Sequence, residues 1–140
     1  MRAALTAALV ALALIGGPAV AKDKKPKLKK PEVEVRALPQ FGFAPVEILA
    51  IVTLKGGDEV EELYCPEIEY DWDDGGRSVK ESDCPPFEPG VTKLTRRMTA
   101  SHTYRRGGSY DLRVRLRRAD KTVASGHARV TVRSAVGEFN

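Results

Sequence analysis

The clearest pattern along the chain is a strict alternation of apolar and polar residues over residues 67–73. Ile68, Tyr70 and Trp72 fall on one side of this stretch, and acidic residues fall on the other side. A period of two is typical of a β-strand that buries one face. The sequence Asp-Asp-Gly-Gly at residues 73–76 then predicts a turn.

Shorter alternating runs predict further strands at residues 33–37, 46–54, 92–101, 110–117 and 128–133. Within residues 92–101, Arg96-Arg97 interrupts the alternation, and a β-bulge there would restore the register. Residues 75–90 are polar and rich in proline, which predicts a long loop or an irregular edge segment. Short β segments separated by turns, without any helical period, predict an all-β fold built as an antiparallel β-sandwich.

Two apolar features need an explanation within such a fold. Phe41 and Phe43 lie in a break between strands, and we expect their rings to close one end of the sandwich. The strand at residues 46–54 is apolar on both faces, because Leu49 and Ile51 occupy its outer face. That outer face is therefore either covered by other residues or used as a contact surface.

The first 21 residues predict a secretory signal peptide. Arg2 supplies a positive charge, residues 3–15 are apolar or small apart from Thr6, and residues 19–21 read Ala-Val-Ala, the spacing of a cleavage site. The apolar run is shorter than the roughly 20 residues that a membrane-spanning helix needs. We expect cleavage after Ala21, a secreted or periplasmic location and no stable membrane span afterwards. An uncleaved anchor is the alternative.

The rest of the chain divides into three predicted parts. Residues 22–31 form a basic flexible linker, residues 32–134 form the β-sandwich, and residues 135–140 form a C-terminal tail. The linker is dominated by lysine, so it cannot bury a core. It is either a soluble spacer or a basic arm that touches anionic lipid or polysaccharide of the envelope. The net charge of the whole chain is only +4.

The chain has two cysteines, Cys65 and Cys84. In an oxidising compartment an even pair predicts one disulfide bond. The closed loop of about 20 residues corresponds to roughly 3 kcal/mol of stabilisation in the loop-entropy model. A metal site is disfavoured because no histidine or further cysteine lies between the two, and their spacing is not that of a redox-active pair.

Two groups of motifs occur in order along the chain. The first is Tyr70-Asp71-Trp72-Asp73-Asp74-Gly75, and the second is His102-Thr103-Tyr104 followed by Gly108-x-Tyr110-x-Leu112-x-Val114-x-Leu116. Together they resemble the PKD domain, the immunoglobulin-like module first named from polycystic kidney disease protein. The resemblance covers residues 33–133. It departs from the family at Asp74-Gly75-Gly76, where the family has Phe-Gly-Asp-Gly, and in the segment that carries the two cysteines.

The resemblance implies an immunoglobulin-like antiparallel β-sandwich of about seven strands. It also implies an extracellular, non-catalytic module of adhesion, carbohydrate binding or spacing. We expect Trp72 to fill the space between the sheets, with Tyr70, Tyr104 and Tyr110 in the structural core. Tyr104 would lie where the chain crosses between the sheets, with its hydroxyl near the backbone. We expect His102 to be structural.

The charged residues of the strands allow two interpretations. In an immunoglobulin-like sandwich the strand at 67–73 pairs with the strand at 110–117, which pairs with the last strand. Acidic and basic side chains would then form cross-strand ion pairs, each contributing about 0.2–1 kcal/mol. Alternatively, the arginines form an anion-binding face, with the excess charge away from the Trp72 strand. The candidate anion-binding residues are Arg113, Arg115, Arg117, Arg129 and Arg133.

The sequence predicts no catalytic residue, cofactor or metal site. It contains no Gly-x-Ser-x-Gly, no His-Glu-x-x-His and no phosphate-binding glycine loop. A carboxylate pair for glycoside cleavage would need a cleft, which a small convex sandwich does not offer. Asp73 and Asp74 could supply two oxygen ligands to calcium, and that question stays open.

We therefore expect an exported, non-catalytic module with a binding or structural role in the cell envelope or extracellular space. One alternative is a polyanion- or polysaccharide-binding protein that uses the basic linker and the outer arginines. Another is an accessory or inhibitor protein with an apolar contact through Leu49 and Ile51. The expected partner is an envelope protein or polysaccharide. Nucleic acid is not expected, because aromatic residues do not interleave with the arginines. The sequence leaves the oligomeric state open.

Overall fold

The computed structural model describes residue 17 and residues 26–135 of the chain. The cleavage point predicted after Ala21, most of the predicted signal peptide and residues 136–140 lie outside the described residues. Within the described part, no helix has the length and hydropathy needed to cross a membrane.

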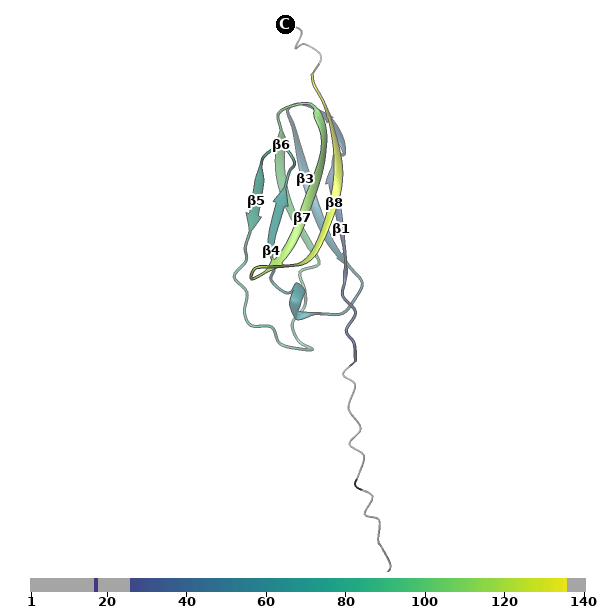
Figure 1. Ribbon diagram of the computed structural model, residues 1–140, viewed down its shortest axis with the longest axis vertical. Helices are drawn as coiled ribbons and strands as arrows, with labels where there is room; N and C mark the ends of the chain where they lie inside the picture. Colours follow the sequence, from purple (N-terminus) through teal and green to yellow (C-terminus); the bar gives the residue numbers. More distant parts are fainter. Residues whose placement is uncertain (1–16, 18–25, 136–140) are drawn as a thin grey trace, which may run out of the picture.

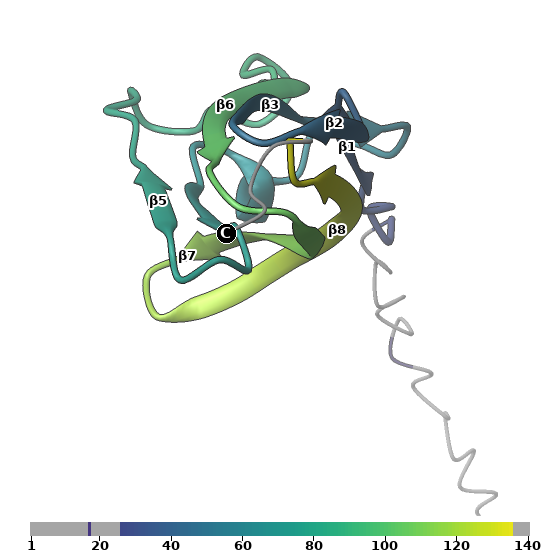
Figure 2. The same ribbon diagram turned by 90° about the horizontal axis from the view of Figure 1, so that it is seen from above.

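Within residues 26–135, eight β-strands form two sheets that face each other (Figure 1). The small sheet has the order β1–β3–β6, from β1 (Glu32–Leu38), β3 (Val46–Lys55) and β6 (Arg97–Tyr104). The large sheet has the order β2–β8–β7–β4–β5, from β2 (Phe41–Phe43), β8 (Lys121–Arg133), β7 (Gly108–Arg118), β4 (Glu67–Asp71) and β5 (Arg77–Lys80). One 3-10 turn, η1 (Glu61–Leu63), joins β3 to β4. Figure 2 shows the large sheet curving around the core like half of a barrel.

The all-β prediction is confirmed, with eight strands in place of about seven. Two strands were not predicted: β2 lies in the segment that was predicted to be a break between strands, and β5 lies inside residues 75–90, which were predicted to form a loop or irregular edge. β5 was missed because its apolar residue, Val79, points to solvent, so the alternation gives no signal. The pairing is antiparallel except between β2 and β8, which run parallel. A three-residue strand such as β2 has no pattern from which its direction could be read.

The strand predicted at residues 92–101 begins later than expected. β6 starts at Arg97, and no bulge is needed at the two arginines. Arg96 lies before the strand, where its carbonyl accepts a hydrogen bond from the Leu54 amide and its side chain pairs with Glu59 at 2.7 Å. The break in alternation therefore marks the end of a loop, because the Arg96 side chain is used to fix that loop to the β3–η1 connection.

The core lies between the two sheets and continues under η1. Each fully buried aliphatic or aromatic side chain contributes about 1.5–3 kcal/mol relative to its exposed state. A second, smaller cluster seals the end of the domain where η1 lies. The largest fully buried side chains of the main core are Ile48, Val52, Tyr70, Trp72, Tyr104, Leu112, Val114, Leu116 and Val130, and the buried side chains of the second cluster are Leu54, Val60, Leu63 and Leu94.

A disulfide bond joins Cys65 and Cys84, which are 19 positions apart in the sequence. It ties the segment after β5 to the segment just before β4. The Tyr64 hydroxyl donates to the Pro85 carbonyl at 2.8 Å, and the Tyr64 ring lies 5.5 Å from that of Phe87. These contacts anchor a long segment without strands, and the bond is consistent with an oxidising extracellular or periplasmic compartment.

The prediction that Phe41 and Phe43 close one end of the fold is wrong. Their side chains are 48% and 55% exposed. Gly42, between them, faces inward, and a Cβ atom at that position would lie 2.8 Å from Val46 Cγ2. Because successive residues of a strand point to opposite sides, the inward position of Gly42 turns both phenylalanine rings outward.

Candidate functional site

The residues of the two sequence motifs meet in a column of aromatic rings. Tyr70 stacks on Trp72 with ring centroids 5.6 Å apart, and Trp72 stacks on His102 at 4.6 Å. His102 then meets Tyr104 edge to face at 5.0 Å, and Tyr104 stacks on Tyr110 at 4.2 Å. The column starts on β4, crosses to β6 of the small sheet and returns to β7. It therefore connects the two sheets at one point.

Trp72 and Tyr104 hold this connection by hydrogen bonds as well as by packing. Both side chains are fully buried. The Trp72 indole Nε1 donates to the Ser78 hydroxyl of β5 at 2.9 Å. The Tyr104 hydroxyl donates to the Trp72 carbonyl at 2.8 Å. The second bond links a β6 side chain to the backbone that follows β4, so it fixes the distance between the sheets at this point.

Burial raises the pKa of the Tyr104 hydroxyl, and the neighbouring carboxylates Asp74 and Asp73 raise it further. Burial alone raises the pKa of Tyr70. The Tyr70 hydroxyl is buried and has no hydrogen-bond partner among the described residues. Both phenols therefore stay neutral, and of these two hydroxyls that of Tyr104 donates a hydrogen bond, to the Trp72 carbonyl.

The acidic turn after β4 is held together by its own carboxylates. Asp71 Oδ1 accepts a hydrogen bond from the Asp73 amide at 3.2 Å, and Asp74 Oδ1 accepts from the Gly76 amide at 2.9 Å. Asp73 Oδ2 accepts from the Asp111 amide of β7 at 2.9 Å. These bonds stabilise the turn and Asp73, which has a positive φ of 63°. Residues 17 and 26–135 contain no group of three or more His, Cys, Asp or Glu side chains placed to hold a metal ion.

Asp74 also pairs with His102, with Asp74 Oδ2 lying 2.6 Å from His102 Nε2. Partial burial opposes ionisation of Asp74, but the hydrogen bonds from His102 and from the Gly76 amide outweigh it and lower the pKa of the carboxyl. Both side chains are about one-fifth exposed. They line a hollow of about 480 Å³ that Arg105, Arg106 and Tyr110 also border. The hollow offers a carboxylate, an imidazole and two guanidinium groups to a polar ligand.

The arginines of β7 are close to carboxylates, as the predicted pairing of β4 and β7 requires. The register sets Glu67 opposite Arg117 and Glu69 opposite Arg115. Arg115 lies 2.8 Å from Glu69, and Arg117 lies 3.4 Å from Glu67 and 3.5 Å from Glu69. Arg113 pairs with Asp111 of its own strand at 3.5 Å. These three candidates for anion binding already have partners.

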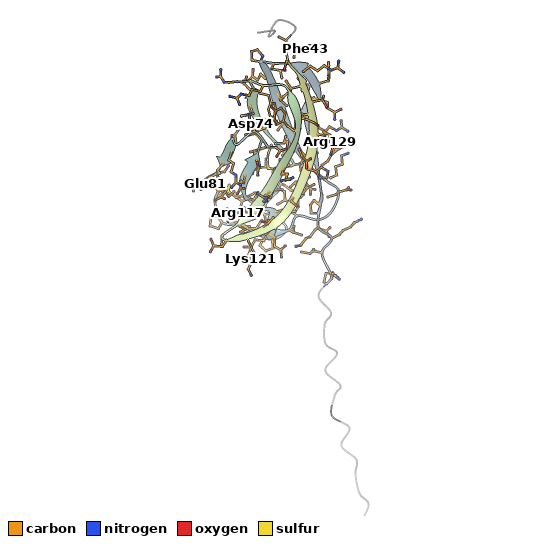
Figure 3. All side chains as sticks on the ribbon, turned by 45° about the horizontal axis from the view of Figure 1, so that its top comes forward. Phe43, Asp74, Glu81, Arg117, Lys121 and Arg129 are labelled. Atoms are coloured by element: carbon orange, nitrogen blue, oxygen red, sulfur yellow. A yellow bond between two sulfur atoms is a disulfide. The ribbon has the colours of Figure 1, made fainter. Side chains whose placement is uncertain are left out.

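Arg129 and Arg133 of β8 differ from the β7 arginines. Neither forms an ion pair with a carboxylate of the described part of the chain. Figure 3 shows Arg129 on the side of the domain that β8 forms, away from Asp74. The five arginines named from the sequence therefore fall into a neutralised group on β7 and a cationic pair on β8.

The apolar contact surface considered for β3 is smaller than the sequence indicated. Leu49 is 37% exposed, but Ile51 is only 8% exposed. Ile51 is the central residue of the outer face of the small sheet, opposite Arg36 on β1 and Thr99 on β6. The groove around it is lined by long polar side chains, including Arg36, Lys55 and Arg97. Ile51 is thus covered by its neighbours within the domain.

Sequence reasoning missed a surface at the end of the domain where β2 lies. It combines the exposed rings of Phe41 and Phe43 with Arg105 and Arg106 in the β6–β7 turn. The sequence Phe-Gly-Phe, with a small residue at the only inward position, was the available signal for the rings. Arg-Arg-Gly-Gly at residues 105–108 was the signal for a cationic turn.

A scan against protein-family models found none that matches this chain, and a search among curated proteins found no match either. What the comparisons and the structure together establish is an all-β protein with two sheets.

Proposed function

We propose that this protein is an exported, non-catalytic, PKD-like module of the immunoglobulin-like sandwich class, with a binding or structural role in the cell envelope or extracellular space. The observation that carries this proposal is the aromatic column. Trp72, His102 and Tyr104, the residues on which the family resemblance rests, contact one another and connect the two sheets. These residues both match the motif of the PKD domain and hold the two sheets together, and this double role supports the architecture of that family.

The same contacts favour a non-catalytic role. His102 is bonded to Asp74 and packed between Trp72 and Tyr104. The Tyr104 hydroxyl is buried and donates a hydrogen bond to the Trp72 carbonyl. The titratable groups of His102 and Tyr104 therefore each already have a partner that fixes the fold, which argues for a structural use.

Export is part of the proposal. The Cys65–Cys84 disulfide supports it, because such bonds persist in oxidising compartments. Expression with the native leader in a host that exports proteins tests this point directly. Intact-mass measurement of the exported protein is expected to give a chain that begins at Lys22 and is two hydrogens lighter than its reduced form. A chain that retains residues 1–21 would contradict cleavage after Ala21.

A glycan and polyanion array with the exported protein, read at low and at physiological salt, tests the binding role. Binding that persists at physiological salt would identify a recognition module and the class of its ligand. Binding that salt removes would identify charge-driven attraction, because counterion release makes such binding fall steeply with salt. Absence of binding at both salts would contradict recognition of these ligands and leave a structural role or a protein partner.

The second candidate is a polyanion-binding protein, and one observation favours it specifically. Arg129 and Arg133 have no carboxylate partner among the described residues, whereas Arg115 and Arg117 do. If this candidate is correct, replacing Arg129 and Arg133 with glutamine should weaken array binding at low salt. The matched replacement of Arg115 and Arg117 should weaken it less, because their charges are already balanced by Glu67 and Glu69.

A further inference from the structure

The end of the domain that carries β2 exposes two aromatic rings side by side. Phe41 and Phe43 are both about half exposed, and their ring centroids lie 5.6 Å apart with the ring planes at 79°. Figure 3 places Phe43 at the extreme end of the domain, opposite to Lys121. Exposed apolar groups that are adjacent and backed by a rigid strand are typical of a binding surface.

The rings are rigidly placed, because β2 is bonded to β8. Phe41 and Phe43 are in register with Thr131 and Arg133 of the neighbouring strand. The Ala44 amide donates to the Arg133 carbonyl at 2.8 Å, and the Thr131 amide donates to the Gln40 carbonyl at 2.8 Å. These bonds hold both ends of β2. A ligand that covers the rings would therefore not need to order the backbone that presents them.

Three arginines lie at the same end of the domain as the rings. The Arg133 guanidinium carbon lies 5.6 Å from the centroid of the Phe41 ring. Arg105 and Arg106 border a hollow of about 660 Å³ together with Ala44 and Ser134, the residues that follow β2 and β8. None of the three arginines pairs with a carboxylate of residues 26–135. The exposed rings therefore share this end of the domain with three arginines that have no acidic partner there.

The β6–β7 turn that carries Arg105 and Arg106 is also fixed in place. The Tyr110 hydroxyl donates to the Arg106 carbonyl at 2.8 Å. A Cβ atom at Gly107 would lie 2.8 Å from the Ser134 amide nitrogen, so only glycine allows the turn to lie this close to the end of β8. The turn is thus packed against the end of β8, the strand that also pairs with β2. The arginines of the turn and the two phenylalanine rings are therefore both held in place by β8.

We propose that this end of the domain, formed by Phe41, Phe43, Arg105, Arg106 and Arg133, binds the surface of an anionic lipid bilayer. The rings enter the boundary between headgroups and acyl chains, where aromatic side chains are favoured. The guanidinium groups contact lipid phosphates, which they can bind through two parallel hydrogen bonds. We call this surface the β2 end. The inference rests on the proposed binding role in the envelope and names the site and the ligand class.

The geometry favours lipid over an acidic polysaccharide. Sugar rings bind on flat aromatic faces, whereas Phe41 and Phe43 are nearly perpendicular and present no common plane. Two apolar rings at the extremity of a domain, with cations behind them, match the layered chemistry of a bilayer, in which an apolar interior lies below a layer of phosphates.

Vesicle co-sedimentation of the exported protein tests the proposal. The probes are vesicles of phosphatidylcholine alone and vesicles that also contain phosphatidylglycerol. We expect binding to the anionic vesicles and much weaker binding to the neutral ones. Phe43→Ala should weaken binding to anionic vesicles about tenfold, from the loss of one inserted ring. The double variant Arg105→Gln/Arg106→Gln should weaken it about thirtyfold, because each arginine near an anionic surface contributes about five- to sixfold.

Val79→Ala is the matched control, because Val79 is also 55% exposed but lies on β5 at the far edge of the large sheet. It should bind vesicles like the parent protein. Because Phe43 is exposed, its replacement should not change the stability of the fold. The urea midpoint of Phe43→Ala should therefore equal that of the parent protein. A Phe43→Trp variant gives a second readout, since its additional fluorescence should shift to shorter wavelength with anionic vesicles. Absence of that shift would overturn insertion of the ring.

Other outcomes overturn the proposal in distinguishable ways. Lack of binding to anionic vesicles, together with salt-resistant binding on the glycan array, would refute the lipid surface and leave the proposed binding role intact. Lack of both would refute the lipid surface and also the recognition of glycans and polyanions. Vesicle binding that is lost in Lys27→Gln/Lys29→Gln but kept in the Phe43 and Arg105/Arg106 variants would assign lipid contact to the linker, at the other end of the domain.

Discussion

Removing one hydroxyl group from Tyr104 tests whether the aromatic column holds the two sheets together. Tyr104 on β6 and Tyr70 on β4 are both fully buried. The Tyr104 hydroxyl donates to the Trp72 carbonyl at 2.8 Å, whereas the Tyr70 hydroxyl has no partner within the described fold. Tyr104→Phe leaves the Trp72 carbonyl without this donor. We expect the free energy of unfolding to fall by about 1–3 kcal/mol, the cost of an unpaired buried polar group.

Tyr70→Phe is the matched control, because it removes the same atom from an equally buried ring of the same column. The Tyr70 hydroxyl is desolvated on folding without a hydrogen bond in return. Its removal should therefore leave stability unchanged or raise it by up to about 1 kcal/mol. Both variants keep an aromatic ring at the position, so stacking on the neighbouring rings is preserved in each and the comparison isolates the hydroxyl.

Urea denaturation of the parent and of both variants measures the difference. Trp72 is the only tryptophan and lies in the column, so its fluorescence reports unfolding at the relevant place. Circular dichroism gives an independent transition, and coincidence of the two supports a two-state analysis. With equal slopes, the shift in midpoint gives the change in stability. Equal losses in the two variants, or a larger loss for Tyr70→Phe, would refute the assigned role of the Tyr104 hydrogen bond.

Three further predictions concern stability. Replacing Cys65 and Cys84 with serine should lower the free energy of unfolding by about 3 kcal/mol, since it frees a long loop in the unfolded chain; a urea titration showing a loss below about 1 kcal/mol would contradict the loop-entropy argument. The folded pKa of Asp74 lies below its ordinary value of 3.8, so its charge stabilises the fold above that pH and the contribution is lost as the pH falls through the folded pKa. The stability advantage of the parent over Asp74→Asn should therefore shrink on acidification below 3.8, and an advantage that stays constant in acid titrations would exclude the carboxylate charge as its source. Ile51→Arg should cost about 2 kcal/mol or more because it places a charge at a buried position, whereas Leu49→Arg should stay within about 0.5 kcal/mol; thermal and urea denaturation showing equal effects would contradict the burial difference.

The sequence alone predicts those strands in which the apolar residues of the alternating pattern are also the residues that the fold buries. Ile68, Tyr70 and Trp72 alternate with acidic residues, and in the structure these apolar side chains are buried. The pairing of β4 with β7 and of β7 with β8 also follows the expected order. Such strands are predictable because the face that packs on the core must be apolar along its whole length. This requirement produces an alternation that is visible in consecutive residues.

The β2 end was not predictable by the same logic. Alternation gives the period of a strand, but it does not state which face is inward when only three residues are available. In β2 the inward residue is Gly42, because only a hydrogen atom fits against Val46. That fact depends on a contact between two strands of different sheets, which alternation does not encode; the glycine between the two phenylalanines was the only local signal for it. The apolar character of Phe41 and Phe43 therefore indicated the wrong face.

The distribution of charge shows why the β2 end matters more than the arginine-rich strand β7. A count of arginines along the sequence favours β7, but the register of β4 against β7 sets Glu67 and Glu69 beside Arg115 and Arg117 and cancels their charge locally. The attraction for anions then depends on cations that have no partner in the sheet.

Among the described residues, Arg105, Arg106 and Arg133 at the β2 end and Lys27 and Lys29 of the linker are cations that form no ion pair with a described carboxylate. The linker joins β1 at the end of the domain opposite to the β2 end, as Figure 1 shows. A flat bilayer that contacts the β2 end therefore does not contact residues 26–31 of the same molecule. A long polyanion that bends around the domain could reach both. Linker variants should consequently leave vesicle binding unchanged, whereas variants at the two ends should have coupled effects on polyanion binding. This difference separates the two ligand classes by mutation alone.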